Sequence, residues 1–123
     1  MQNYKSKFKS DLKSRCYNFS LKLIAFVDTL PNKRSCWIIA DQLLRSGMSI
    51  GANLFEAHSS SSKLEFKKFH EIALKSGNEA KYWLGLLRDS GMANKEIINA
   101  LLQEVKELTN MIAAGILTMK GKR

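Results

Sequence analysis

Residues 42–87 read QLLRSGMSIGANLFEAHSSSSKLEFKKFHEIALKSGNEAKYWLGLL. A run of four serines divides this stretch into two long segments that both have the apolar periodicity of helices. Ser62 and Glu65 have the S-x-x-E spacing of a capping box, which predicts that the second helix begins there. The stretch is therefore interpreted as a helical hairpin with a serine-rich turn.

The first helix of this hairpin carries a row of polar side chains on one broad face, while its other sides are apolar. A helix that is apolar on most sides is usually buried on most sides, so we expect the polar row inside the bundle, where its groups need partners. Folding the hairpin about its turn places Arg45 opposite Glu79, and Glu56 opposite Lys67 or Lys68. The predicted structural polar network consists of Gln42, Arg45, Ser49, Asn53, Glu56 and Glu79.

An interior Arg45–Glu79 ion pair is the central element of that network. Removing one partner of a buried pair costs about 3–5 kcal/mol, so Glu79→Ala is expected to destabilise more than Glu104→Ala. A binding or catalytic role for the row is the other interpretation.

The rest of the chain predicts an all-α fold. With one proline and seven glycines among 123 residues, few positions interrupt helices. The apolar spacing predicts four helices in a single domain, 1–123, at about 10–30, 33–57, 63–90 and 94–119. Short turns between them give an antiparallel up-down-up-down four-helix bundle. The apolar faces are wider than one bundle seam needs, which favours a homo-oligomer.

The net charge of +9 favours anionic partners. The up-down-up-down order brings the start of the first helix, the second turn and the end of the chain to one end of the bundle. The candidate nucleic-acid-binding residues at this basic end are Lys5, Lys7, Lys9, Lys63, Lys67, Lys68, Lys120, Lys122 and Arg123. RNA or DNA would be bound through phosphates. An acidic protein partner, or charge that serves solubility alone, are the alternatives.

No enzyme is predicted, because no catalytic constellation, phosphate-binding glycine loop or metal-ligand spacing is found. His70 is interpreted as a helix-surface or hydrogen-bonded residue rather than a functional group. In the antiparallel pairing of the first two predicted helices, Cys16 and Cys36 lie too far apart along the helix axis to form a disulfide. We therefore expect both to be buried thiols. We expect no cofactor, no metal, no membrane association and a cytoplasmic location.

The sequence resembles the bacterial four-helix bundle proteins, also called the 23S rRNA-intervening-sequence protein family, from about Phe8 to Leu117. The residues that carry the resemblance are Gln42-Leu43, Arg45-Ser46, Ser49-Ile50-Gly51-Ala52-Asn53, Glu56-Ala57, Ser62, Phe66, Ile72-Ala73-Leu74-Lys75, Glu79 and Tyr82-Trp83-Leu84, with Arg15, Phe19 and Leu30-Pro31. The family pattern often has an acidic residue where Ser76 stands and a threonine where Ala80 stands.

The resemblance implies a small helical bundle without enzymatic activity, and several family members form ring-like homopentamers. The accessory proteins of diversity-generating retroelements are similar in fold, and they associate with a reverse transcriptase and nucleic acid. The first hypothesis is thus a homo-oligomeric bundle that binds nucleic acid through its basic end. The alternative is a protein-interaction adaptor, such as a reverse-transcriptase accessory subunit.

Overall fold

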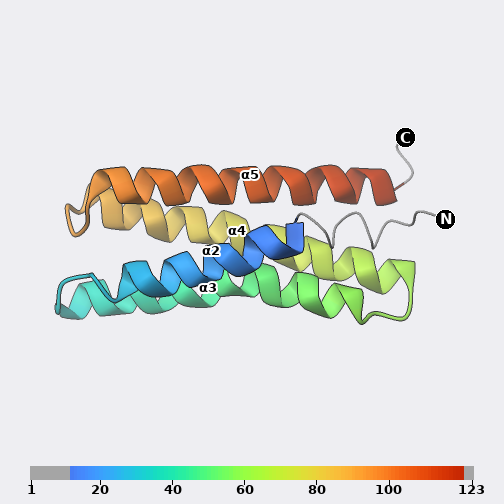
Figure 1. Cartoon of the computed structure of the whole chain (residues 1–123), viewed down its shortest axis with the longest axis horizontal. Helices are drawn as coiled ribbons and strands as arrows, with labels where there is room; N and C mark the ends of the chain where they lie inside the picture. The colour runs from blue at the N-terminus through green and yellow to red at the C-terminus, as the bar shows by residue number, and fades with distance from the viewer. Residues whose placement is uncertain (1–11, 121–123) are drawn as a thin grey trace.

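The computed structural model describes residues 12–120, and this part of the chain is an all-α bundle (Figure 1). Its helices are α2 (Ser14–Val27), α3 (Arg34–His58), α4 (Lys63–Asp89) and α5 (Lys95–Met119). Each helix runs antiparallel to the one before it, and the neighbouring pairs are α2 with α3, α3 with α4, α4 with α5 and α5 with α2. The predicted all-α fold is confirmed.

Short-range hydrogen bonds explain where α4 and α5 begin. The Ser62 hydroxyl accepts a hydrogen bond from the Glu65 amide at 3.0 Å, and the Glu65 carboxylate accepts one from the Ser61 amide at 2.9 Å. Asn94 caps α5 by accepting from the Ile97 amide at 3.0 Å. In both caps a side-chain acceptor satisfies an amide that the helix itself leaves unbonded, and the cap at Ser62 was expected from its spacing.

The first helix differs from its predicted range of about 10–30. It ends at Val27, and the Thr29 hydroxyl then donates to the Phe26 carbonyl at 2.7 Å in a turn that leads into Pro31. The backbone amides of Thr29 and Leu30 donate to the carbonyls of Phe26 and Val27 at 3.0 and 3.1 Å, so the chain tightens into a turn ahead of the proline. The predicted start near residue 10 lies outside the described residues, and α2 begins at Ser14.

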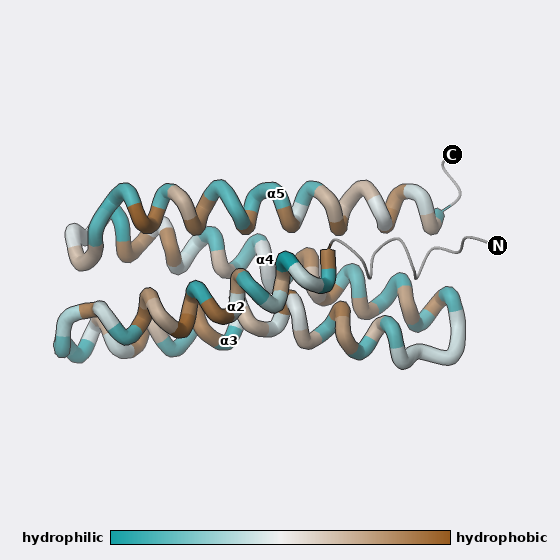
Figure 2. The backbone as a smooth tube through the Cα atoms, viewed as in Figure 1, coloured by the Kyte–Doolittle hydropathy of each residue, from teal (hydrophilic) through white to brown (hydrophobic). Residues whose placement is uncertain are grey.

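The core is formed by the apolar stripe of every helix. Phe19, Phe66, Ile50 and Leu84 are among its fully buried large side chains. Figure 2 shows hydrophobic segments alternating with hydrophilic ones along the helices, as an amphipathic pattern requires. No helix in the described part of the chain is long and apolar enough to cross a membrane.

Two glycines allow helices to approach closely. A Cβ atom at Gly47 would collide with Leu23 of α2, and one at Gly77 would collide with Thr109 of α5. Gly85 on α4 is different, because a Cβ there would meet no atom within 4 Å. A glycine-to-alanine substitution is therefore expected to lower the stability at Gly77 and to raise it at Gly85.

Cys16 and Cys36 are buried and free, as expected. Burial in apolar surroundings raises the pKa of Cys16 to about 12, and burial also raises the pKa of Cys36. Both thiols therefore stay protonated at neutral pH and pack as small apolar groups.

Candidate nucleic-acid interface and neighbouring sites

The turn between α3 and α4 lies at the same end of the bundle as the C-terminus of α5 (Figure 1). Lys63, Lys68 and Lys120 are exposed there, and Lys67 is half-buried. Within residues 12–120, Lys67, Lys68 and Lys120 take part in no ion pair. Their ammonium groups can therefore bind anions without first breaking a contact to a carboxylate. Lys5, Lys7, Lys9, Lys122 and Arg123 lie outside the described residues.

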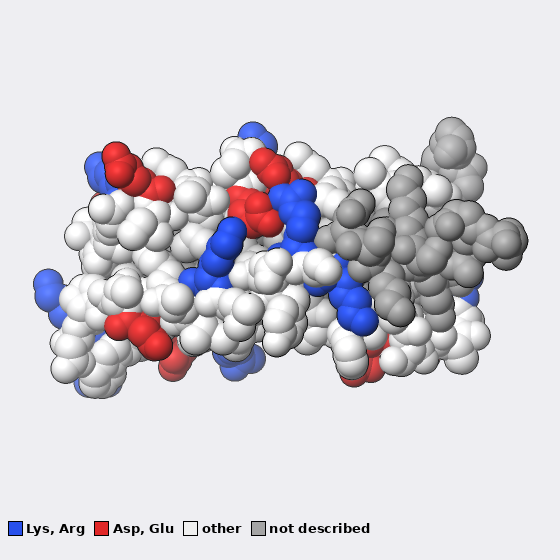
Figure 3. All heavy atoms as spheres, in the orientation of Figure 1, with Lys and Arg blue, Asp and Glu red and all other residues white. Residues whose placement is uncertain are grey.

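The acidic residue nearest to Lys63 in sequence is already engaged, because Glu65 belongs to the helix cap. Where α2 and α5 meet, by contrast, basic side chains have acidic partners. Figure 3 shows the face with α2 in front, where basic and acidic side chains adjoin each other near the middle of the molecule. Basic charge is thus compensated in the middle of this face.

The predicted Arg45–Glu79 ion pair is wrong. Arg45 and Glu79 are both exposed, and the Glu79 carboxylate instead accepts a hydrogen bond from the indole Nε1 of Trp83 at 3.0 Å. Glu56 is exposed as well and forms no ion pair with Lys67 or Lys68. The reason is geometric: the side of α3 that faces the core is occupied by Leu43, Ile50 and Leu54, so the polar row lies on the outer flank next to α4.

A smaller polar network does exist between α3 and α4. The Ser49 and Ser76 hydroxyls are hydrogen-bonded across the two helices at 2.9 Å. Asn53 donates its amide hydrogens to the Ser49 carbonyl at 2.8 Å and to the Ser49 hydroxyl at 2.9 Å. Gln42, the remaining member of the predicted network, is half-buried on the same flank. These contacts fix the register of two helices without burying a charge.

Sequence reasoning missed a charge cluster between α2 and α5. Arg15 donates from Nη2 to Glu104 at 2.8 Å and to Glu107 at 2.7 Å, and from Nε to Glu104 at 3.2 Å. The pKa of Arg15 is raised, first of all by the hydrogen bond to Glu104. The pKa of Glu107 is lowered by hydrogen bonds from Gln103 and then from Arg15. Glu104 and Glu107 are three residues apart and so lie on one side of α5, and this spacing could have indicated a shared basic partner.

His70 is a buried residue, 1% exposed. Its Nδ1 donates to the Phe66 carbonyl at 2.9 Å, and its ring lies against the Phe66 ring with 4.4 Å between the ring centroids. Burial lowers the pKa of His70, and the hydrogen bond to the carbonyl only partly opposes this. His70 is therefore a buried residue with a hydrogen bond to the backbone, and its expected alternative as a helix-surface residue is wrong.

The lowered pKa of His70 predicts a pH dependence of stability. Below about pH 6.5 the unfolded chain binds a proton at this residue while the folded chain does not, so the free energy of unfolding falls as the pH falls. The slope approaches about 1.4 kcal/mol per pH unit for one proton. Urea unfolding at pH 7.5, 6.5 and 5.5 measures it. His70→Phe should flatten this dependence and His58→Gln should keep it; equal slopes in both variants would contradict the assignment.

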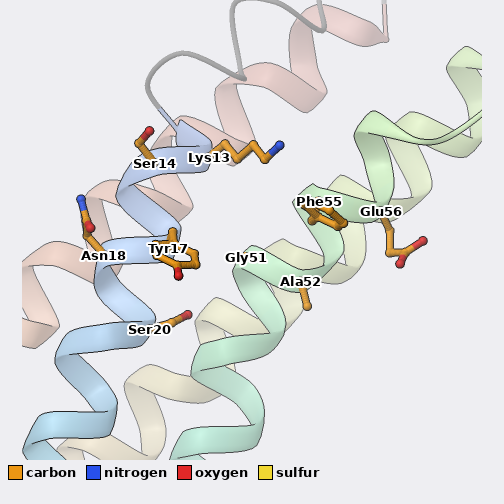
Figure 4. A pocket seen from close by; sticks show the side chains of 9 residues that line it. All are labelled: Lys13, Ser14, Tyr17, Asn18, Ser20, Gly51, Ala52, Phe55 and Glu56. Atoms are coloured by element: carbon orange, nitrogen blue, oxygen red, sulfur yellow. The ribbon is translucent and has the colours of Figure 1, made fainter.

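An open groove of about 850 Å³ lies between α2 and α3. Lys13 and Tyr17 point from α2 toward α3, where Phe55 stands beyond the small residues Gly51 and Ala52 (Figure 4). The Lys13 ammonium lies 4.8 Å from the centroid of the Phe55 ring, within the range of a cation–π contact. The groove offers apolar surface with few converging polar groups, which suits packing more than catalysis. Residues 12–120 hold no cluster of three His, Cys, Asp or Glu side chains suited to a metal ion.

The helical bundle has a counterpart among solved proteins. The model of the 23S rRNA-intervening sequence protein family matches residues 9–114. The chain belongs to this family. A solved protein of unknown function from the S23 ribosomal protein family of Bacteroides thetaiotaomicron is 30% identical and superposes with a TM-score of 0.80. The match covers 85% of this chain and 97% of that one. Among curated proteins, none matches the chain.

Proposed function

We propose that this member of the 23S rRNA-intervening sequence protein family is a non-enzymatic, cytoplasmic, homo-oligomeric bundle that binds RNA or DNA through its basic end. The observation that carries the proposal is the group formed by Lys67, Lys68 and Lys120 where α3, α4 and α5 meet, on a chain of net charge +9. Within the described residues these three lysines take part in no ion pair. Lysines that neutralise phosphates release condensed counterions, and this release drives binding without base recognition.

A charge-reversal experiment tests this proposal. Changing Lys63, Lys67 and Lys68 to Glu is expected to weaken binding of a fluorescent RNA or DNA oligonucleotide by at least about a hundredfold, because each phosphate contact is replaced by a repulsion. The control changes Lys22, Lys33 and Arg34 to Glu, since these exposed residues lie toward the other end of the bundle and alter the net charge equally. Anisotropy titrations measure both variants, and equal losses would contradict a local site.

Self-association is supported by large apolar side chains that the single chain leaves exposed. Tyr17, Trp37, Phe55 and Tyr82 are each more than half exposed, and isolated proteins seldom leave so much aromatic surface in water. An oligomer would also repeat the basic end and raise its avidity for a polyanion. The family resemblance implies five copies. Light scattering should give a mass well above that of one 13.9 kDa chain, and a monomer would contradict the oligomer.

The adaptor function is the second candidate, and the groove between α2 and α3 favours it. Tyr17 and Phe55 provide an apolar lining, and the rim carries Lys13 and Glu56. Such a surface suits an amphipathic helix of a partner such as a reverse transcriptase. Binding that requires the partner protein, and that the charge-reversal triple variant does not weaken, would favour this candidate over nucleic acid.

A further inference from the structure

We propose that the outer face between α4 and α5 binds the phosphate backbone of a double-helical nucleic acid, with Lys81 and Lys106 as contacts beyond the basic end. This inference rests on the proposed function and deepens it. It names a duplex as the partner, and it places the path of that duplex along one side of the bundle.

The contact between α4 and α5 fixes where these two lysines lie. At Gly77 a Cβ atom would collide with Thr109 and would lie 3.8 Å from the side chain of Val105, so the helices touch there. Lys81 follows Gly77 by about one turn, and Lys106 precedes Thr109 by about one turn. Because the helices are antiparallel, both lysines lie at about the same level on the outer side of this contact.

The same spacing recurs on both helices. Lys67 and Lys81 on α4, and Lys106 and Lys120 on α5, are separated by nearly four whole turns, so each pair shares one side of its helix. The antiparallel arrangement places Lys67 near Lys120 at the end of the bundle and Lys81 near Lys106 farther along it. The helix rise gives about 21 Å, along the bundle axis, between the level of Lys67 and Lys120 and the level of Lys81 and Lys106.

Acidic side chains are sparse on this face. Glu104 and Glu107 point to Arg15 on the other side of α5, and Glu79 bonds Trp83 on the side of α4 next to α3. Within residues 12–120, Glu71 is the remaining acidic residue of these two helices between the level of Lys67 and Lys120 and the level of Lys81 and Lys106. Within the described residues, Lys81 and Lys106 form no ion pair, and the Lys81 ammonium donates to the neutral side chain of Asn78 at 3.1 Å. The face therefore keeps a positive charge.

The lack of aromatic side chains in α5, Lys95–Met119, points to a duplex. No Phe, Trp, Tyr or His occurs in α5, from Lys95 to Met119. On α4, the ring of the exposed Tyr82 is engaged edge-on with the ring of Trp83, with 5.0 Å between the centroids. Proteins that hold single strands combine basic grooves with aromatic side chains on which bases stack. Lysines without such platforms contact phosphates alone. A duplex presents these densely, at one charge per about 1.7 Å of its axis in DNA.

The test uses the full chain with fluorescent duplex RNA, duplex DNA and an unstructured single strand of equal length. Lys81→Glu with Lys106→Glu is compared with Lys22→Glu and Lys33→Glu, which change the net charge equally on another part of the surface. The first variant should bind duplex about tenfold more weakly at 0.1 M salt, with a salt slope smaller by about 2, whereas the control changes little. Lys81→Gln with Lys106→Gln gives the same loss of slope without repulsion, and circular dichroism checks folding of each variant.

The outcomes separate the two proposals. If the wild type binds and Lys81→Glu with Lys106→Glu leaves duplex binding unchanged, the α4–α5 path is wrong and the basic end remains. Tighter wild-type binding to the single strand than to either duplex would overturn the duplex assignment. If the wild type binds no nucleic acid even at low salt, both proposals fail.

Discussion

Replacing Glu104 with alanine is expected to lower the free energy of unfolding by about 2 kcal/mol, because hydrogen bonds to charged groups contribute about 1.5–3 kcal/mol each. Glu104 accepts two hydrogen bonds from Arg15, and its side chain is only 22% exposed. Arg15 is 35% exposed, so solvent screens part of the attraction and the effect stays below that of a fully buried pair. The cluster also joins α2 to α5, which are otherwise in limited contact.

Glu79→Ala is the matched control, and it reverses the ranking that the sequence suggested. Glu79 is exposed and loses only its hydrogen bond from Trp83, so we expect a change below about 0.5 kcal/mol. Urea unfolding followed by circular dichroism measures both variants at one fixed protein concentration, because self-association would make stability depend on concentration. A larger loss for Glu79→Ala than for Glu104→Ala would contradict the observed pairing.

Gly77→Ala is expected to cost about 1–2 kcal/mol. Overpacking a helix interface costs about 1–3 kcal/mol, and the better helix propensity of alanine returns about 0.5–1 kcal/mol. The added methyl group would collide with Cγ2 of Thr109, which is short, β-branched and buried, so it has little freedom to move away.

Gly85→Ala on the same helix should have the opposite sign. A Cβ at Gly85 meets no atom within 4 Å, so only the propensity term of about 0.5–1 kcal/mol remains and the variant should be more stable. Thermal and urea unfolding of the two variants, side by side, give the comparison. Equal effects at Gly77 and Gly85 would show that α4 and α5 do not approach each other as described.

Local patterns were sufficient to predict the helices. The cap at Ser62 acts within a few residues, so the start of α4 can be predicted from the S-x-x-E spacing. The end of α2 was placed three residues too late, because the Thr29 hydroxyl bond to Phe26 closes the helix before the proline does. The cysteines were predicted correctly because geometry alone excluded their disulfide.

The polar contacts were harder to predict, because periodicity shows which residues share a face but not whether that face points inward. Arg45 belongs to an outer flank, so its expected partner was wrong. On the same flank, Ser49 accepts a hydrogen bond from Asn53 and is hydrogen-bonded to Ser76. Arg15 and Glu104 stand 89 residues apart, and no local rule links them. The α3–α4 turn and the C-terminus of α5 lie at one end of the bundle, as the predicted topology requires, and the binding role of Lys63, Lys67, Lys68 and Lys120 there stays a prediction.

The most direct test of the central claim is a salt series of nucleic-acid binding by the wild-type chain. We predict that the logarithm of the affinity for a duplex falls linearly with the logarithm of the salt concentration. With several phosphates contacted, this corresponds to a loss of at least about a hundredfold between 50 and 200 mM. An affinity that stays constant over this range, or no binding at 50 mM salt, would contradict it.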